Sequence, residues 1–314
     1  MPIIDLSTPP PPPTGLLEAL PRRVSLTLPE LRLVAECAGG APLPFDHPDG
    51  KAPGGESGGV LDDRLGLGRG SVEDQAYADA LDSLHDPATS LARRGLRSQE
   101  GTVDDGLLGA VGLLATPEVA LELDLTMDGV RVKAWHRQAG PAVATLATAD
   151  GIVFELAWFP TDQWPQELAR VAAVPDDLSL HHSAVPALVD LPYELADAAA
   201  EAVRSGRPDL VPVLVAQHSG AALDATGAPY ADADVATALA ALSTEHRGRL
   251  RALVADVSGS ESTLVGVLSW VLLADGWRAL RPHQREGVHR VEVRRVEPGD
   301  LAPDLAPVLA EVTA

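Results

Sequence analysis

Residues 119–137 alternate between apolar and polar side chains on both sides of an Asp128-Gly129 dipeptide. A period of two is typical of a β-strand, and Asp-Gly between two such runs predicts a two-residue hairpin turn. With residue 127 facing residue 130, one face carries Leu121, Leu123, Leu125, Met127, Val130, Val132 and Ala134, and the other carries Glu122, Asp124, Thr126, Arg131, Lys133 and Trp135. One largely wet face predicts an antiparallel sheet covered on one side, with Asp124 paired across the strands to Lys133.

Two more Asp-Gly dipeptides predict further β-hairpins. Around Asp150-Gly151, residues 142–158 form a second hairpin, and one face is expected to carry Val143, Ile152, Phe154, Leu156 and Trp158. Around Asp275-Gly276, a strand at about 263–273 turns into one at about 277–281. Further strands are predicted at the start of VSLTLPELRLVAECAGG, about residues 24–28, and at about 248–256 and 288–296, the last with alternating Val and Arg.

Helical patterns separate these strands. A helix after Thr27 or Leu28 has Pro29 in its first turn and ends at Gly39-Gly40, which are typical start and stop signals. The other predicted helices cover about 71–85, 88–94, 103–115, 162–173, 193–204, 208–217, 232–243 and 299–311, and residues 174–192 are expected to be a loop. Helices, strands and a closing helix thus occur twice in the same order. The sequence predicts one α+β domain, residues 22–314, with two pseudo-symmetric halves at about 22–175 and 176–314.

Two segments outside this pattern are rich in proline or glycine. Residues 1–21 contain the run Pro9–Pro13, which favours an extended polyproline II arm or spacer over a ligand for SH3-type domains. Residues 41–70 are predicted to form a mobile Gly/Pro-rich loop.

Charge and cysteine content limit the classes of function. The formal net charge of −21 and the pI near 4.7 disfavour binding to phosphate backbones or anionic lipid. The single cysteine, Cys37, cannot form an internal disulfide and is expected to pack in a helix. With no signal-peptide pattern and no apolar run of membrane-spanning length, a cytoplasmic protein is expected.

The sequence gives little support for catalysis. Residues 54–59 read GGESGG, which matches the G-x-S-x-G pattern around Ser57. A nucleophile elbow needs a strand before the serine and a helix after it, whereas Ser57 lies in the Gly-rich loop. The glycines of 65–70 lack the Lys-Ser or Lys-Thr of a phosphate loop. A hydrolase using Ser57 is kept only as a minor alternative, and no cofactor is expected.

Metal binding is not expected either. His181 and His182 are adjacent, so their side chains diverge on a strand or a helix, and no further ligands stand at a suitable spacing. Asp46, His47 and Asp49 lie in the predicted loop and are interpreted as solvated. With neither a catalytic nor a metal constellation, a binding protein becomes the favoured class.

The stretch SWVLLADGWRAL, residues 269–280, is apolar on both faces. With Ala274 opposite Trp277, one face carries Trp270, Leu272, Ala274, Trp277, Ala279 and Arg281, and the other carries Val265, Val267, Ser269, Val271, Leu273 and Leu280. Something must cover both faces. One interpretation is a central strand pair packed by the protein's own helices. The other is that part of one face docks a partner, since Trp beside Arg is typical of protein-binding surfaces.

Three blocks of the sequence resemble the EspG family: VSLTLPELRLVAECAGG with LPF near the start, the segment 103–151, and LSWVLLADGWRALRP followed by VHRVEVRRVEPGDLAPDLAPVLAEV. The middle block includes the corner Leu114-Ala115-Thr116-Pro117-Glu118. The resemblance covers about residues 22–313. It implies a quasi-twofold α+β domain whose central antiparallel sheet is flanked by helical bundles, and it implies neither catalysis nor a cofactor. The tight Asp128-Gly129 turn departs from members that use a longer loop there.

The resemblance also implies a function. EspG proteins are cytosolic chaperones of type VII (ESX) secretion that bind the apolar tip of a PPE protein in a PE–PPE heterodimer. We therefore expect a chaperone for a PE/PPE-like or other helical type VII client, either monomeric or homodimeric. The residues expected at or under the client surface are Trp158, Trp270, Trp277 and Arg278. The main alternative is a homodimeric interaction module that buries its apolar face against itself.

Overall fold

The computed structural model describes residues 22–45, 77, 79–81, 83–259 and 263–312. Its contacts divide the chain into two compact units. The first consists of residues 1–118 and 135–161, and the second of residues 119–134 and 162–314. The predicted Pro-rich tail, most of the predicted loop at 41–70, most of the predicted helix at 71–85 and Ser57 lie outside the described residues.

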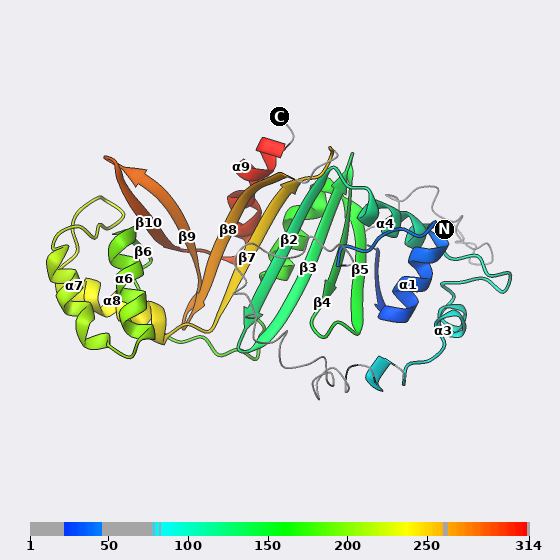
Figure 1. Ribbon diagram of the computed structural model, residues 1–314, viewed down its shortest axis with the longest axis horizontal. Coiled ribbons are helices and arrows are strands. Elements are labelled where there is room, and N and C mark those ends of the chain that lie inside the picture. Colours follow the sequence, from blue (N-terminus) through cyan, green and yellow to red (C-terminus); the bar gives the residue numbers. More distant parts are fainter. Residues whose placement is uncertain (1–21, 46–76, 78, 82, 260–262, 313–314) are drawn as a thin grey trace, which may run out of the picture. The chain divides into compact units, whose positions relative to one another are not determined.

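The strands form a ten-stranded sheet in the order β1-β5-β4-β3-β2-β7-β8-β9-β10-β6 (Figure 1). The pairs β1–β5, β4–β5, β2–β7, β7–β8, β8–β9, β9–β10 and β6–β10 are antiparallel. The strands are β1 (Arg22–Thr27), β2 (Val119–Met127), β3 (Val130–Ala139), β4 (Ala142–Thr148), β5 (Val153–Pro160), β6 (Leu188–Pro192), β7 (Gly248–Asp256), β8 (Thr263–Leu273), β9 (Gly276–Arg285) and β10 (Val288–Arg295). An antiparallel sheet with helices outside it confirms the predicted α+β class.

The helices follow the sequence pattern closely. They are α1 (Leu28–Cys37), α3 (Pro87–Arg93), α4 (Asp105–Ala115), α5 (Trp164–Val171), α6 (Tyr193–Arg204), α7 (Val211–Gln217), α8 (Asp232–Thr244) and α9 (Leu301–Val312). Short 3-10 turns at Thr161–Gln163, Pro208–Leu210 and Pro298–Asp300 lead into α5, α7 and α9. These turns explain why the predicted helices at 162–173, 208–217 and 299–311 begin before the α-helical residues.

The connections of the sheet occur twice. β1 is an edge strand followed by α1 and pairs with β5, the last strand of the run β2–β5. In the same way, β6 is an edge strand followed by α6 and pairs with β10, the last strand of the run β7–β10. The repeated topology agrees with the predicted repeat of elements. A quasi-twofold geometry and a division near residue 175 stay predictions.

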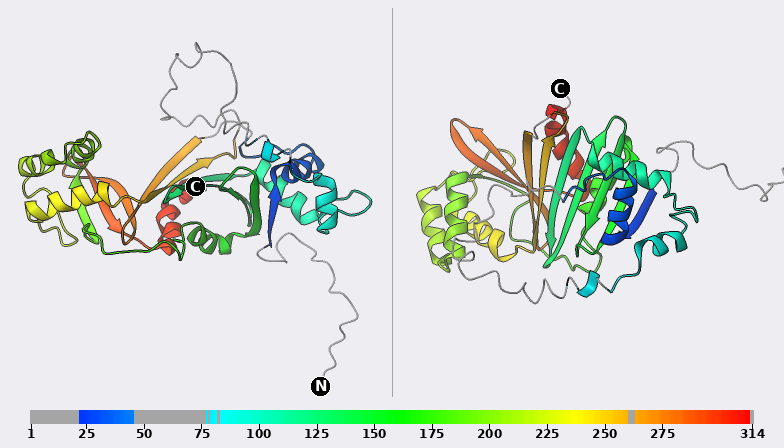
Figure 2. Two further views of the ribbon diagram at one scale, coloured as in Figure 1. Left: turned by 90° about the horizontal axis from the view of Figure 1, so that it is seen from below. Right: turned by 45° about the vertical axis from the view of Figure 1, so that its right-hand side comes forward.

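The core of the first unit lies between its strands and α1, α3 and α4 (Figure 2). β1 supplies Leu26, α1 supplies Leu31, and β5 supplies Leu156 and Trp158, all of which are buried. α1 begins as its sequence predicts. The Thr27 hydroxyl accepts a hydrogen bond from the Glu30 backbone N–H, and the Glu30 carboxylate accepts one from the Thr27 N–H at 2.8 Å. This capping box satisfies two free N–H groups at the helix start.

Glu30 gives the first unit an acid-sensitive contact. Burial alone would raise the pKa of the Glu30 carboxyl, but hydrogen bonds from Thr27 and Ser90 and the Arg94 guanidinium hold this pKa below 4.5. A carboxyl whose pKa is lower in the folded chain stabilises it above pH 4.5, and this stabilisation is lost as the pH falls through the lowered pKa. We expect Glu30→Gln to lower the unfolding free energy by about 1–2 kcal/mol at pH 7, since Arg94 loses its anion.

Urea unfolding of the Glu30→Gln variant and the wild type over a pH series tests this expectation. The stability difference should shrink as the pH falls below 4.5. A difference that stays constant down to about pH 3 would show that the charge of Glu30 contributes nothing.

In the second unit, helices cover both faces of the sheet. Adjacent residues of β8 show this, because they point to opposite sides. The Trp270 indole N–H lies 3.2 Å from Asp304 of α9. Val271 instead packs against the core formed with α6, α7 and α8. Around Trp270 and Val271, the predicted double-faced apolar hairpin therefore packs against the chain's own helices on both sides, whereas Val267, nearer the start of β8, is exposed.

Two predicted strand registers need correction. Leu272 of β8 pairs with Trp277, not Ala274, which lies in the turn. The shift is two residues, so the residues still share the predicted faces. In the second hairpin, Val143 pairs with Phe159, so it lies on the face opposite Trp158, whereas Ala144 pairs with Trp158. The assignment of Val143 to the Trp158 face was therefore wrong.

Other local predictions also differ from the structure. Asp124 forms an ion pair with Arg131, which the sequence did not predict, and the charge of Lys133 also lowers the pKa of the Asp124 carboxyl. Trp135, expected on the wetter face, is buried and packs 5.7 Å from the ring of Phe45. Cys37, expected to pack, is exposed at the end of α1. The predicted loop at 174–192 contains edge strand β6.

Candidate functional site

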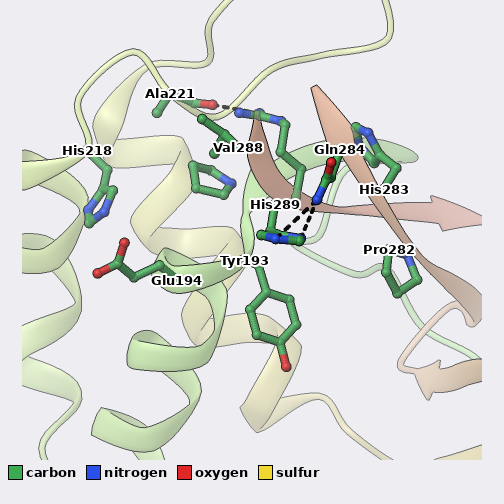
Figure 3. A pocket seen from close by; sticks show the side chains of 11 residues that line it. Tyr193, Glu194, His218, Ala221, Pro282, His283, Gln284, Val288 and His289 are labelled. Atoms are coloured by element: carbon green, nitrogen blue, oxygen red, sulfur yellow. Dashed lines mark hydrogen bonds between the residues drawn. The ribbon is translucent and has the colours of Figure 1, made fainter. Parts of the chain in front are cut away.

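A groove with a volume of about 920 Å³ lies in the second unit (Figure 3). Three parts of the chain line it: residues 192–194 at the start of α6, residues 218 and 221 after α7, and residues 282–284 and 288–290 of the β9–β10 hairpin. The groove is open to solvent and mostly apolar at its surface, which is typical of binding sites.

Two exposed apolar side chains of the groove, Tyr193 and Val288, owe their positions to local structure. β6 ends at Pro192 and α6 begins directly at Tyr193, which leaves the Tyr193 side chain 54% exposed. The β9–β10 turn is Glu286-Gly287, with φ angles of 54° and 80°. Positive φ at both turn residues is typical of a type I′ hairpin turn. The next residue, Val288, begins β10 and is 50% exposed.

An ionic cluster of Asp190, His283 and Arg290 forms part of the groove, since His283 and Arg290 line it. Arg290 of β10 donates from Nε to Asp190 Oδ2 of β6 at 2.8 Å, and His283 Nε2 of β9 lies 3.0 Å from Asp190 Oδ1. The Arg290 guanidinium also donates to the carbonyl oxygens of Asp190 and Ala221 at 2.9 and 2.8 Å. Since Arg290 and Asp190 are both buried, the cluster fixes three strands and the segment after α7 in one arrangement.

Three histidines line the groove. The His218 Nδ1 lies 3.0 Å from the Leu214 carbonyl oxygen, so Nδ1 carries the proton and Nε2 is free to accept a hydrogen bond when the ring is neutral. His218 and Glu194 point toward each other in Figure 3. The Gln284 amide nitrogen lies 3.2 Å from His289 Nε2. The groove therefore combines apolar contact area with a few polar groups at its edges.

Among the described residues, no group of three or more His, Cys, Asp or Glu side chains could hold a metal ion. His181 and His182 are exposed, and neither belongs to such a group. Within the described ranges, no helix is both long and apolar enough to cross a membrane.

The structure places the four predicted contact residues inside the protein. Trp158 is in the first unit and is 3% exposed, whereas Trp270, Trp277 and Arg278 are in the second and are at most 1% exposed. The rings of Trp270 and Trp277 lie 6.1 Å apart. Their role in client binding stays a prediction, and such buried groups can act only by supporting residues above them.

Arg278 is held by the chain itself. Its guanidinium lies 3.0 Å from Asp275 Oδ2 in the β8–β9 turn and 3.2 Å from the Val185 carbonyl oxygen. None of the four predicted residues lines the groove.

Sequence reasoning missed the groove because its parts are far apart in the chain. The strand predicted to end at about residue 281 continues to Arg285. Strand β6 lies in a segment that was predicted to be a loop. One signal was available: residues 282–290 read PHQREGVHR, in which Glu286-Gly287 separates two histidine-containing strand ends.

Comparisons with known proteins identify the architecture. No protein-family model and no curated protein matches the sequence. Among solved structures, the chain matches that of the Mycobacterium tuberculosis type VII secretion system chaperone EspG5 in complex with the PE25-PPE41 dimer, with a TM-score of 0.58. The chain has an EspG-like fold. The match covers 92% of this chain and 96% of the other, so the structural similarity extends over almost all of both chains. The sequence identity is 13%. It establishes the fold alone, and it agrees with the resemblance seen in the sequence.

Proposed function

We propose that this chain is a cytosolic, non-enzymatic chaperone of a type VII (ESX) secretion system. It binds the apolar tip of a helical PE/PPE-like client, keeps the client soluble and targets it for secretion. The observation that carries the proposal is the EspG-like fold, since the matched chaperone was solved in complex with the PE25-PPE41 dimer. The groove in the second unit supplies a surface for such a client.

The geometry of the groove suits the end of a helical hairpin. Tyr193 of α6 and Val288 of β10 both line the groove and offer exposed apolar anchors. The Asp190–Arg290 pair keeps the walls in place without the client. A preformed site avoids the entropy cost of ordering the walls on binding. Trp270, Trp277 and Arg278 lie in the core of the same unit and would stabilise this surface from beneath.

Charging one wall of the groove should abolish client binding. We expect Val288→Asp to lower the yield of co-purified client at least tenfold, because a carboxylate would be desolvated against the apolar tip. The measurement is co-expression of the tagged chain with each small helical protein pair encoded beside it, followed by size exclusion.

Val153→Asp is the matched control. Val153 is also the first residue of a strand, is 44% exposed and lies in the first unit, outside the groove. It should retain the client. Equal loss in both variants would point to a nonspecific effect of charge, and binding that survives Val288→Asp would remove the groove from the proposal. If no client is held by the wild type, the chaperone function itself is contradicted.

A further inference from the structure

Glu194 gives the groove a negative charge that the chain itself leaves unpaired. It is the only acidic residue among the described residues that line the groove, and it lies exposed in the first turn of α6. Within the part of the chain that the structure describes, no group forms a hydrogen bond or an ion pair with its carboxylate. A carboxylate at this position also offsets the partial positive charge of the helix start, so the helix end does little to repel a cation.

His218 places a second acceptor opposite Glu194. The two side chains point toward each other in Figure 3. Because His218 Nδ1 donates its proton to the Leu214 carbonyl oxygen, Nε2 of the neutral ring is left as an acceptor. Two acceptors that point at each other cannot form a hydrogen bond without a donor between them. A guanidinium, amidinium or ammonium group carries several N–H donors and can donate to both.

The arginine and the other two histidines of the groove have partners of their own. The Arg290 guanidinium is buried and lies 2.8 Å from Asp190 Oδ2, and His283 Nε2 lies 3.0 Å from Oδ1 of the same carboxylate. His289 Nε2 lies 3.2 Å from the Gln284 amide nitrogen. The uncompensated charge of the groove is therefore negative. The net charge of −21 on the whole chain adds a long-range attraction for cations.

We propose that Glu194 and His218 bind a basic side chain, an arginine or a lysine, that projects from the apolar tip of the client. The aliphatic stem of such a side chain packs on the apolar groups of the same groove, which include Tyr193 and Val288. Its charged end donates to the carboxylate and to the imidazole. The source of the cation rests on the proposed chaperone function, whereas the cation site itself does not. The groove then selects clients by charge as well as by apolar fit.

Benzamidine is a suitable probe of the site, because it joins an apolar ring to an amidinium. Benzamide is its neutral counterpart of nearly the same shape. We expect the full chain to bind benzamidine with a Kd on the order of 1 mM. Benzamide should bind about fivefold more weakly, since only the amidinium forms charge-assisted hydrogen bonds. NMR of the histidine ring protons measures both affinities, with the His218 signals assigned through a His218→Gln variant.

Glu194→Gln should weaken benzamidine binding about fivefold and leave the thermal midpoint nearly unchanged, since the side chain is exposed. Asp197→Asn is the matched control, because Asp197 is an exposed acidic residue of the same helix that does not line the groove. It should bind benzamidine as the wild type does. Equal affinity of the wild type for benzamidine and benzamide overturns the proposal, and so does undiminished binding by Glu194→Gln. Acetate that shifts the His218 signals when benzamidine does not would identify an anion site and overturn it as well.

Co-purification separates the cation site from the chaperone function. Glu194→Lys should lower the yield of co-purified client at least about tenfold, because it sets one cation against another, and Asp197→Lys should retain the client. A client that is retained by Glu194→Lys, or held by a wild type that does not bind benzamidine, overturns the basic side chain and leaves the chaperone function standing. A wild type that binds benzamidine but holds no client contradicts the chaperone function and overturns the client as the source of the cation.

Discussion

Trp277→Ala is expected to lower the free energy of unfolding by about 3–5 kcal/mol, because the change leaves a large cavity in a closed core. Trp277 is 1% exposed, and its ring packs 6.1 Å from that of Trp270. Its indole N–H donates to the Ala172 carbonyl oxygen at the end of α5, at 2.8 Å. The substitution therefore removes apolar burial and also leaves a buried acceptor without its donor. Urea unfolding followed by tryptophan fluorescence and circular dichroism measures the loss.

Tyr193→Ala provides the contrast for this experiment. Tyr193 is also aromatic and belongs to the same unit, but it is 54% exposed in the groove. We expect its replacement to change stability by less than about 1 kcal/mol and to weaken client binding. A Trp277→Ala variant that keeps wild-type stability but loses its client would instead place Trp277 in direct contact with the client.

The hairpins were predictable because their signals are local. Asp128-Gly129 and Asp150-Gly151 join strands where expected, and Gly129 and Gly151 have the positive φ values of 84° and 71° that these turns require. The faces of β8 and β9 were also predicted correctly, although the register was not, since a two-residue shift leaves every side chain on its own face. Local periodicity therefore determines which residues share a face.

Periodicity does not reveal what covers a face. Trp135 stands among polar residues of β3 but is buried against Phe45, which lies ninety residues earlier in the chain. From the sequence, Trp270 and Trp277 could belong to a core or to a docking surface, and the positions of α5 and α9 decide between these two interpretations. Burial at these sites depends on distant segments, so a single sequence cannot supply it.

The groove could not be predicted either, because it too depends on segments that are distant in the chain. Its walls come from β6 with α6, from the end of α7, and from the β9–β10 hairpin. β6 has only five residues, LVDLP, and ends in proline, so it has too few alternations to be recognised as a strand. Without β6, nothing in the sequence indicates that Asp190 and Arg290 form a pair.

Asp190→Ala is the second change with a large expected effect. The Arg290 guanidinium is buried and has the Asp190 carboxylate at 2.8 Å as its anionic partner. Removing that carboxylate leaves a buried cation uncompensated, which costs about 3–5 kcal/mol of unfolding free energy. The loss should appear as a lower urea midpoint with an unchanged slope. Asp209→Ala breaks an Arg–Asp pair of similar length between exposed side chains, so it should leave the midpoint near that of the wild type.

A double variant separates the charge from the packing. In Asp190→Leu with Arg290→Met, the cation and the anion leave together, and most of the lost stability should return, since buried ion pairs are often no better than well-packed apolar groups. Client binding should not return with it. Arg290 also holds the Ala221 carbonyl oxygen at 2.8 Å, and without that bond the segment after α7 is no longer fixed against β10. Recovery of both properties would mean that the ionic cluster has no part in shaping the groove.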